Sequence, residues 1–175
     1  MNPTAILIAD NIGVLDQARE LLSELPDELY SKPEPSVHSS GIGSHLRHCV
    51  DYYDRFFEGL SGGRIDYDQR ERDERLETSR TYAIEKLEAL QKKLQSLDTQ
   101  VGTLLIRQDS EAEGDEVPWA PSSLERELQF QMSHAVHHYA LIAVILRLNG
   151  EVPPEGFGVA PSTLRYWKET GQCAP

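Results

Sequence analysis

The amino-acid sequence predicts an all-α protein, a four-helix bundle formed by a single domain over residues 1–175. Four segments repeat apolar residues at the three- and four-residue spacing of a helix with one buried face. Three connections, two of them long, join these segments, and no stretch has the pattern of a buried parallel strand. A chain of 175 residues is long enough to form its own hydrophobic core.

The first helix is expected to begin at Asn2-Pro3, where a capping residue precedes a proline suited to the first helical turn. Its apolar stripe ends before Pro26. Residues 27–38 contain two further prolines and are predicted to form a loop.

The second helix is expected from about Ser40 to Phe57, with Gly59 ending it. Residues 61–78 are almost without apolar side chains, which predicts a long solvated crossover that holds no core element. Thr78 is the predicted cap of a leucine-rich third helix.

A small β-hairpin is predicted before the last long helix, because residues 102–119 form two extended pieces around an acidic turn. The last long helix starts at Ser122, the first residue of an S-x-x-E capping box, and ends at Asn149-Gly150. The tail is expected to lie against the bundle and to form a short helix over 162–170.

Charge and composition narrow the class of protein. A net charge of −12 argues against partners such as nucleic acid or an anionic membrane surface, since both require a basic patch. The longest apolar run, residues 140–146, is too short to span a membrane, and no secretory signal is evident. The two cysteines, Cys49 and Cys173, provide no disulfide framework, so a cytoplasmic location is expected.

Three of the six histidines fall in SHAVHH, residues 133–138, within the most apolar helix. His134 and His138 are one turn apart on the face expected to be buried, and His137 lies on its flank. These side chains suit three roles: core histidines with satisfied nitrogens, acid–base catalysts, or ligands of a metal ion. Two imidazoles at this spacing can bind one ion, and bundles build metal sites from facing helices.

A third imidazole is available from the second helix, in SHLRHC. His45 lies closer to the apolar arc of that helix, so burial favours it. His48 lies at the polar edge of the arc, near Asp51, where a ligand would remain accessible to substrate. The helical pattern leaves both candidates open.

IGSHLRHCVDYYDRFF and SHAVHHYALI resemble the motifs of the DinB-like superfamily, which includes bacillithiol transferases. The resemblance implies a four-helix bundle with a divalent metal held by three histidines. Matching the motifs assigns His48, His134 and His138 as ligands, while His45, the alternative ligand, falls where the family has an aliphatic residue. The acidic crossover and the GFGVAPST tail depart from the family and indicate a distinct branch.

Three neutral imidazoles leave a divalent ion its full charge and an open position, which is typical of a catalytic site. Zinc is expected, with nickel and iron as alternatives, because all three ions accept such ligands. The resemblance implies a transferase that acts on a small-molecule substrate, a low-molecular-weight thiol. A homodimer is a further expected partner state. The alternatives are a hydrolase that uses metal-bound water and a non-catalytic bundle stabilised by its metal.

No catalytic residue is identified from the sequence. Four side chains are candidates for orienting the ligands: Asp51, Tyr52, Glu127 and Tyr139. Cysteine catalysis is disfavoured, because Cys49 lies on the apolar arc of its helix and is expected to be a small core residue.

Overall fold

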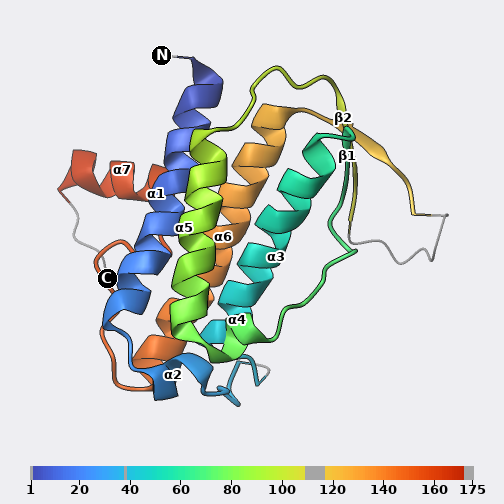
Figure 1. Ribbon diagram of the computed structural model, residues 1–175. Coiled ribbons are helices and arrows are strands. Elements are labelled where there is room, and N and C mark those ends of the chain that lie inside the picture. The colour runs from blue at the N-terminus through green and yellow to red at the C-terminus, as the bar shows by residue number, and fades with distance from the viewer. Residues whose placement is uncertain (1, 38, 109–116, 172–175) are drawn as a thin grey trace.

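The computed structural model describes residues 2–37, 39–108 and 117–171 and shows four long helices packed side by side (Figure 1). These helices are α1 (Pro3–Glu24), α3 (Ile42–Leu60), α5 (Arg80–Gln95) and α6 (Leu124–Leu148). Helix α1 packs on α5 and α6, and α3 packs on the same two helices from the other side. The predicted four-helix bundle is therefore confirmed.

Apolar side chains from all four helices form one core. Leu15, Leu46, Leu87 and Leu128, one from each helix, are at most 1% exposed. Burying a leucine side chain stabilises the fold by about 1.5–3 kcal/mol, so this common core holds the helices together.

A buried polar residue crosses the same core. Asn11 of α1 accepts a hydrogen bond from the hydroxyl of Tyr53 in α3, at 2.7 Å. Its amide nitrogen donates to the carbonyls of Leu7 and Leu128, at 2.8 and 2.9 Å. Because every polar atom of the side chain is paired, Asn11 fixes the register of three helices without an unsatisfied group.

The predicted boundaries of three helices are wrong by one or a few residues. Helix α5 is capped by Ser79 rather than Thr78, and α6 by Ser123 rather than Ser122. Helix α3 begins at Ile42 and continues through Gly59, which lies against the next segment. A Cβ at Gly59 would meet the Arg64 carbonyl oxygen at 2.4 Å, so this glycine allows a close backbone approach rather than ending the helix.

The predicted loop over 27–38 contains a short helix, α2 (Asp27–Ser31). Tyr30 of this helix is fully buried, and its hydroxyl donates to the carbonyl of Leu76. One anchored aromatic residue thus orders a segment whose prolines indicated only irregular structure.

The crossover over 61–78 contains a strand and a further short helix, α4 (Arg75–Thr78). Strand β1 (Arg64–Asp66) pairs in parallel with β2 (Leu104–Arg107), which pairs antiparallel with β3 (Ala120–Ser122). Ile65, Tyr67 and Leu76 are buried, so the prediction of a solvated crossover is wrong. The expectation that the chain has no parallel strand is also wrong, because β1 and β2 are parallel.

A β-hairpin is present as β2 and β3, but β3 begins at Ala120, one residue after the predicted range of 102–119. The predicted acidic turn includes residues 109–116, which lie outside the described residues. The tail forms α7 (Pro161–Thr170), and Phe157 stacks on Tyr139 of α6 with ring centroids 5.0 Å apart. Within the described ranges, no helix combines the length and apolar character needed to cross a bilayer.

Candidate metal centre

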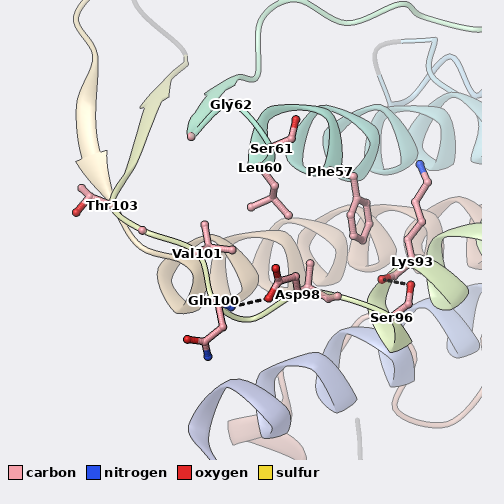
Figure 2. Close-up of a pocket in the computed structure, with 13 residues that line it drawn as sticks. Phe57, Leu60, Ser61, Gly62, Lys93, Ser96, Asp98, Gln100, Val101 and Thr103 are labelled. Atoms are coloured by element: carbon pink, nitrogen blue, oxygen red, sulfur yellow. Dashed lines mark hydrogen bonds between the residues drawn. The ribbon is translucent and has the colours of Figure 1, made fainter.

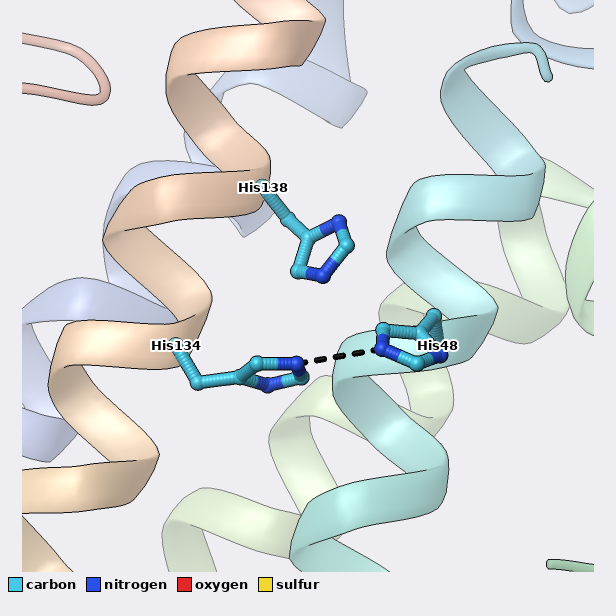
Figure 3. A group of neighbouring side chains, drawn as sticks. All are labelled: His48, His134 and His138. Atoms are coloured by element: carbon cyan, nitrogen blue, oxygen red, sulfur yellow. Dashed lines mark hydrogen bonds between the residues drawn. The ribbon is translucent and has the colours of Figure 1, made fainter. Parts of the chain in front are cut away.

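Three histidine rings converge between α3 and α6 (Figure 3). His48 comes from α3, whereas His134 and His138 come from successive turns of α6. One nitrogen from each ring lies within 4.8 Å of the others. Nε2 of His48 and Nε2 of His134 are 3.1 Å apart, and His138 lies on the neighbouring turn.

Aromatic side chains form one wall of this histidine cluster. The ring of Tyr52 lies 4.1 Å from that of His134 and 4.8 Å from that of His48, measured between centroids. Phe130 stacks on His134 at 5.7 Å. All three histidines are half-buried, so their inner edges face a partly dehydrated space.

An arginine from the crossover reaches the outer nitrogen of His48. Nη1 of Arg70 lies 2.7 Å from Nδ1 of His48. A guanidinium can only donate, so Nδ1 accepts, and neutral His48 carries its proton on Nε2. That proton then points at Nε2 of His134. The sequence patterns did not indicate this contact.

Burial keeps two histidines of the cluster neutral. It lowers the pKa of His48 to about 3, with the neighbouring charges of His134 and Arg70 adding to the effect. Burial, followed by the proximity of His134 and His48, lowers the pKa of His138 to about 2. Neutral imidazole is the form that binds metal ions, so these two rings have the required protonation state near pH 7.

The donor set fits a divalent ion. Three ligands of a tetrahedral zinc ion, each about 2.0–2.1 Å from the metal, lie about 3.3 Å from one another. The nitrogens of His48 and His134 already have nearly this separation, at 3.1 Å. Within the part of the chain that the structure describes, the cluster includes no carboxylate or cysteine. Such a set leaves the ion its charge and room for another ligand.

His45 lies beside the cluster rather than within it. It is only 8% exposed, and its Nδ1 is 3.0 Å from Nδ1 of His138. Its Nε2 is buried and finds no hydrogen-bond partner among the described residues. Burial, followed by the proximity of His137, lowers the pKa of His45. His45 therefore contacts the outer nitrogen of His138.

The four candidate orienting residues have different partners. Tyr52 contacts the histidine rings directly. Asp51 is buried and pairs with Arg47, at 2.9 Å. Glu127 accepts hydrogen bonds from Tyr67 and Ser122, and Tyr139 stacks on Phe157 with its hydroxyl buried.

Two other features are separate from this centre. A cavity of about 740 Å³ lies at the end of α3, between Phe57, Lys93 and Val101 (Figure 2), and no histidine of the cluster lines it. Cys49 is buried, and burial raises the pKa of its thiol, so it remains protonated and enclosed. His38 and Cys173 lie outside the described residues.

Comparisons with known proteins identify a family. A sequence model of the DinB superfamily matches residues 13–142, a range that includes all three histidines. A protein named FK506-binding protein 5, from Rhizopus delemar, is 36% identical over 110 residues, which cover 60% of this chain. The matched region is 28% of that relative, so this chain corresponds to less than a third of it. No solved structure matches the chain.

Proposed function

The chain belongs to the DinB superfamily, and we propose that it is an enzyme whose divalent metal ion is held by His48, His134 and His138. The observation that carries this proposal is the convergence of three imidazoles from two helices. A structural zinc site closes all four positions with protein ligands, whereas three ligands leave a position for substrate.

We further propose that the substrate in that position is a low-molecular-weight thiol, and that the reaction transfers it to an electrophile. When bound, a zinc, nickel or ferrous ion would supply the positive charge that stabilises a thiolate. The thiol comes from the substrate, because Cys49 is enclosed in the core with a raised pKa. Tyr52 and Phe130 place aromatic rings directly against His134.

His45 is the proposed positioning residue for His138. If Nε2 of His138 faces the ion, Nδ1 must carry the proton and donate to Nδ1 of His45, 3.0 Å away. This bond fixes both the tautomer and the orientation of the ligand ring. His45 therefore acts through His138 and is not itself a ligand.

Metal content tests the ligand assignment directly. Elemental analysis of the untagged protein should give about one divalent ion per chain, in keeping with one cluster. His134→Ala and His138→Ala should each lower this content well below the wild-type value. His137→Ala is the matched control, since His137 is exposed on the same helix and should leave the content unchanged. Undiminished metal in both ligand variants would overturn the proposal.

A spectroscopic experiment tests the thiol. Adding a small thiol to the cobalt-substituted protein should produce an intense sulfur-to-metal charge-transfer band, because the thiolate becomes a ligand. An unchanged spectrum would instead favour a hydrolase that uses bound water. If chelation abolishes the helical signal, the ion is required for the fold, and the non-catalytic alternative is correct.

A further inference from the structure

Arg70 differs from the other partly buried arginines of this chain. Five other arginines are half-buried in the described residues, and each forms an ion pair with a carboxylate: Arg19, Arg47, Arg55, Arg80 and Arg107. Arg70 is also half-buried, yet no carboxylate of the described residues pairs with it. The charge of Arg70 counters the rise in the pKa of buried Asp51, but without an ion pair, so in a chain of net charge −12 its partly buried position requires another explanation.

The guanidinium of Arg70 lies against the histidine cluster. Its carbon atom is 5.4 Å from the centroid of the Tyr52 ring, and Nη1 bonds to Nδ1 of His48. Nε is buried and finds no hydrogen-bond partner among the described residues. Arg70 therefore has donor capacity beside the cluster that the described protein atoms do not use.

The bond between Arg70 and His48 conflicts with metal ligation by His48. A neutral imidazole that binds an ion through Nε2 carries its proton on Nδ1. Nδ1 is then a donor and faces another donor, Nη1 of Arg70. The two groups cannot remain at hydrogen-bond distance, so ligation requires Arg70 to leave Nδ1.

We propose that Arg70, once it leaves His48, binds an anionic oxygen group of the substrate beside the metal ion. This inference rests on the proposed function, because it assumes that His48 is a ligand. The fork of guanidinium N–H groups matches the two oxygens of a carboxylate or a phosphate. Tyr52 supports the face of the guanidinium, so its donors remain directed along the plane of the group.

The test measures cobalt affinity in chloride, acetate and inorganic phosphate at equal ionic strength, for the wild type and Arg70→Gln. In chloride, Arg70→Gln should bind cobalt about tenfold more tightly, since the amide oxygen can accept from Nδ1–H of His48. In the wild type, acetate or phosphate should raise the affinity roughly fivefold or more, because an anion that pairs with the released Arg70 favours the loaded form.

The anion effect should vanish in Arg70→Gln and persist in the matched control Arg72→Gln, which removes an exposed arginine two residues away. An effect of acetate alone identifies a carboxylate ligand, and an effect of phosphate alone identifies a phosphate. Circular dichroism verifies that each variant is folded.

An anion effect of equal size in wild type and Arg70→Gln would overturn the inference, because the anion would then bind the ion itself. Equal cobalt affinities in all media would also overturn it while leaving the metal site intact. A wild-type protein that binds no cobalt would instead refute the proposed function, and the inference with it.

Discussion

At the scale of single residues, the two histidines of SHLRHC occupy different environments although they lie only three positions apart. His48 directs Nε2 toward His134, whereas His45 is deeper and contacts the outer nitrogen of His138. Helical periodicity placed both on or near the buried face but could not say which would point between His134 and His138. Which histidine points there depends on how far α3 is shifted along α6, and this shift is set by the packing of the whole bundle.

The first prediction separates their roles. His48→Ala should abolish metal binding and leave the helical signal largely intact, because His48 is only half-buried. His45→Ala should retain the ion with affinity reduced about 10–100-fold, since a second-layer partner of His138 is lost. It should also lower the free energy of unfolding by roughly 1–3 kcal/mol, because a buried ring is removed. Elemental analysis and urea denaturation measure the two effects.

The reverse result, with metal lost only in His45→Ala, would make His45 the ligand. It would also contradict the match between SHLRHC and the family motif, because that match assigns His48 as the ligand.

Arg70 shows the limit of pattern reasoning at this scale. The sequence places Arg70 in an acidic, apolar-poor stretch, where a solvated side chain is the reasonable expectation. Its contact with His48 spans 22 positions and depends on how the crossover returns to α3. Neither helical periodicity nor motif spacing indicates the path of the crossover, so neither predicts this contact.

At the scale of elements, the long helices were predictable because their apolar stripes repeat over many turns, whereas the crossover was not. Its buried residues, Ile65, Tyr67 and Leu76, are isolated in the sequence and form no periodic pattern. Each lies against a different element. The strand of Ile65 pairs with β2, Tyr67 bonds to Glu127 of α6, and the carbonyl of Leu76 accepts a hydrogen bond from α2. Isolated apolar residues between charges can therefore anchor a segment.

The second prediction concerns the connection of the crossover to α6. The hydroxyl of Tyr67 donates to Oε2 of Glu127 at 2.7 Å, and Glu127 is only 2% exposed. Tyr67→Phe leaves this buried carboxylate with one donor fewer, so the free energy of unfolding should fall by about 1.5–3 kcal/mol. Urea denaturation measures the change, with Tyr166→Phe on the exposed face of α7 as the control. A loss within about 0.5 kcal/mol of the control would show that solvent replaces the bond.

The third prediction tests how the tail attaches to α6. Gly158 has φ of +71°, and a Cβ there would meet the backbone nitrogen of Ala140 at 2.5 Å. Gly171 has a similar φ of +66° but nothing within 4 Å of a Cβ. Gly171→Ala should therefore lower stability only through the unfavourable left-handed backbone conformation, by about 1–2 kcal/mol. Gly158→Ala should cost clearly more, because two backbones must separate and Phe157 loses its stacking on Tyr139.

Thermal unfolding of both variants measures this difference. Equal losses in the two proteins would mean that the tail shifts away from α6 without cost.

At the scale of the whole molecule, the stability of the fold is linked to proton binding by the buried histidines. Burial lowers the pKa of His45, His48 and His138 in the folded protein. In the unfolded chain each imidazole has its ordinary pKa of about 6.5. Between these values the unfolded state binds protons that the folded state does not. The contribution of these groups to stability is therefore complete above about pH 6.5 and decreases as the pH falls toward the folded pKa values.

The fourth prediction follows from this linkage. In the presence of a chelator, the urea midpoint should fall between pH 7.5 and pH 5.5, a range in which ordinary carboxylates remain ionised. His138→Leu should show a smaller fall over the same range, because one of the groups that gains a proton on unfolding is gone. The absolute stability of the variant does not affect the comparison, since only the change with pH is used. A midpoint that stays constant from pH 7.5 to 5.5 in the wild type would mean that the folded protein protonates these histidines as readily as the unfolded chain. Burial would then not lower their pKa values, and the cluster would be partly protonated below about pH 6.5.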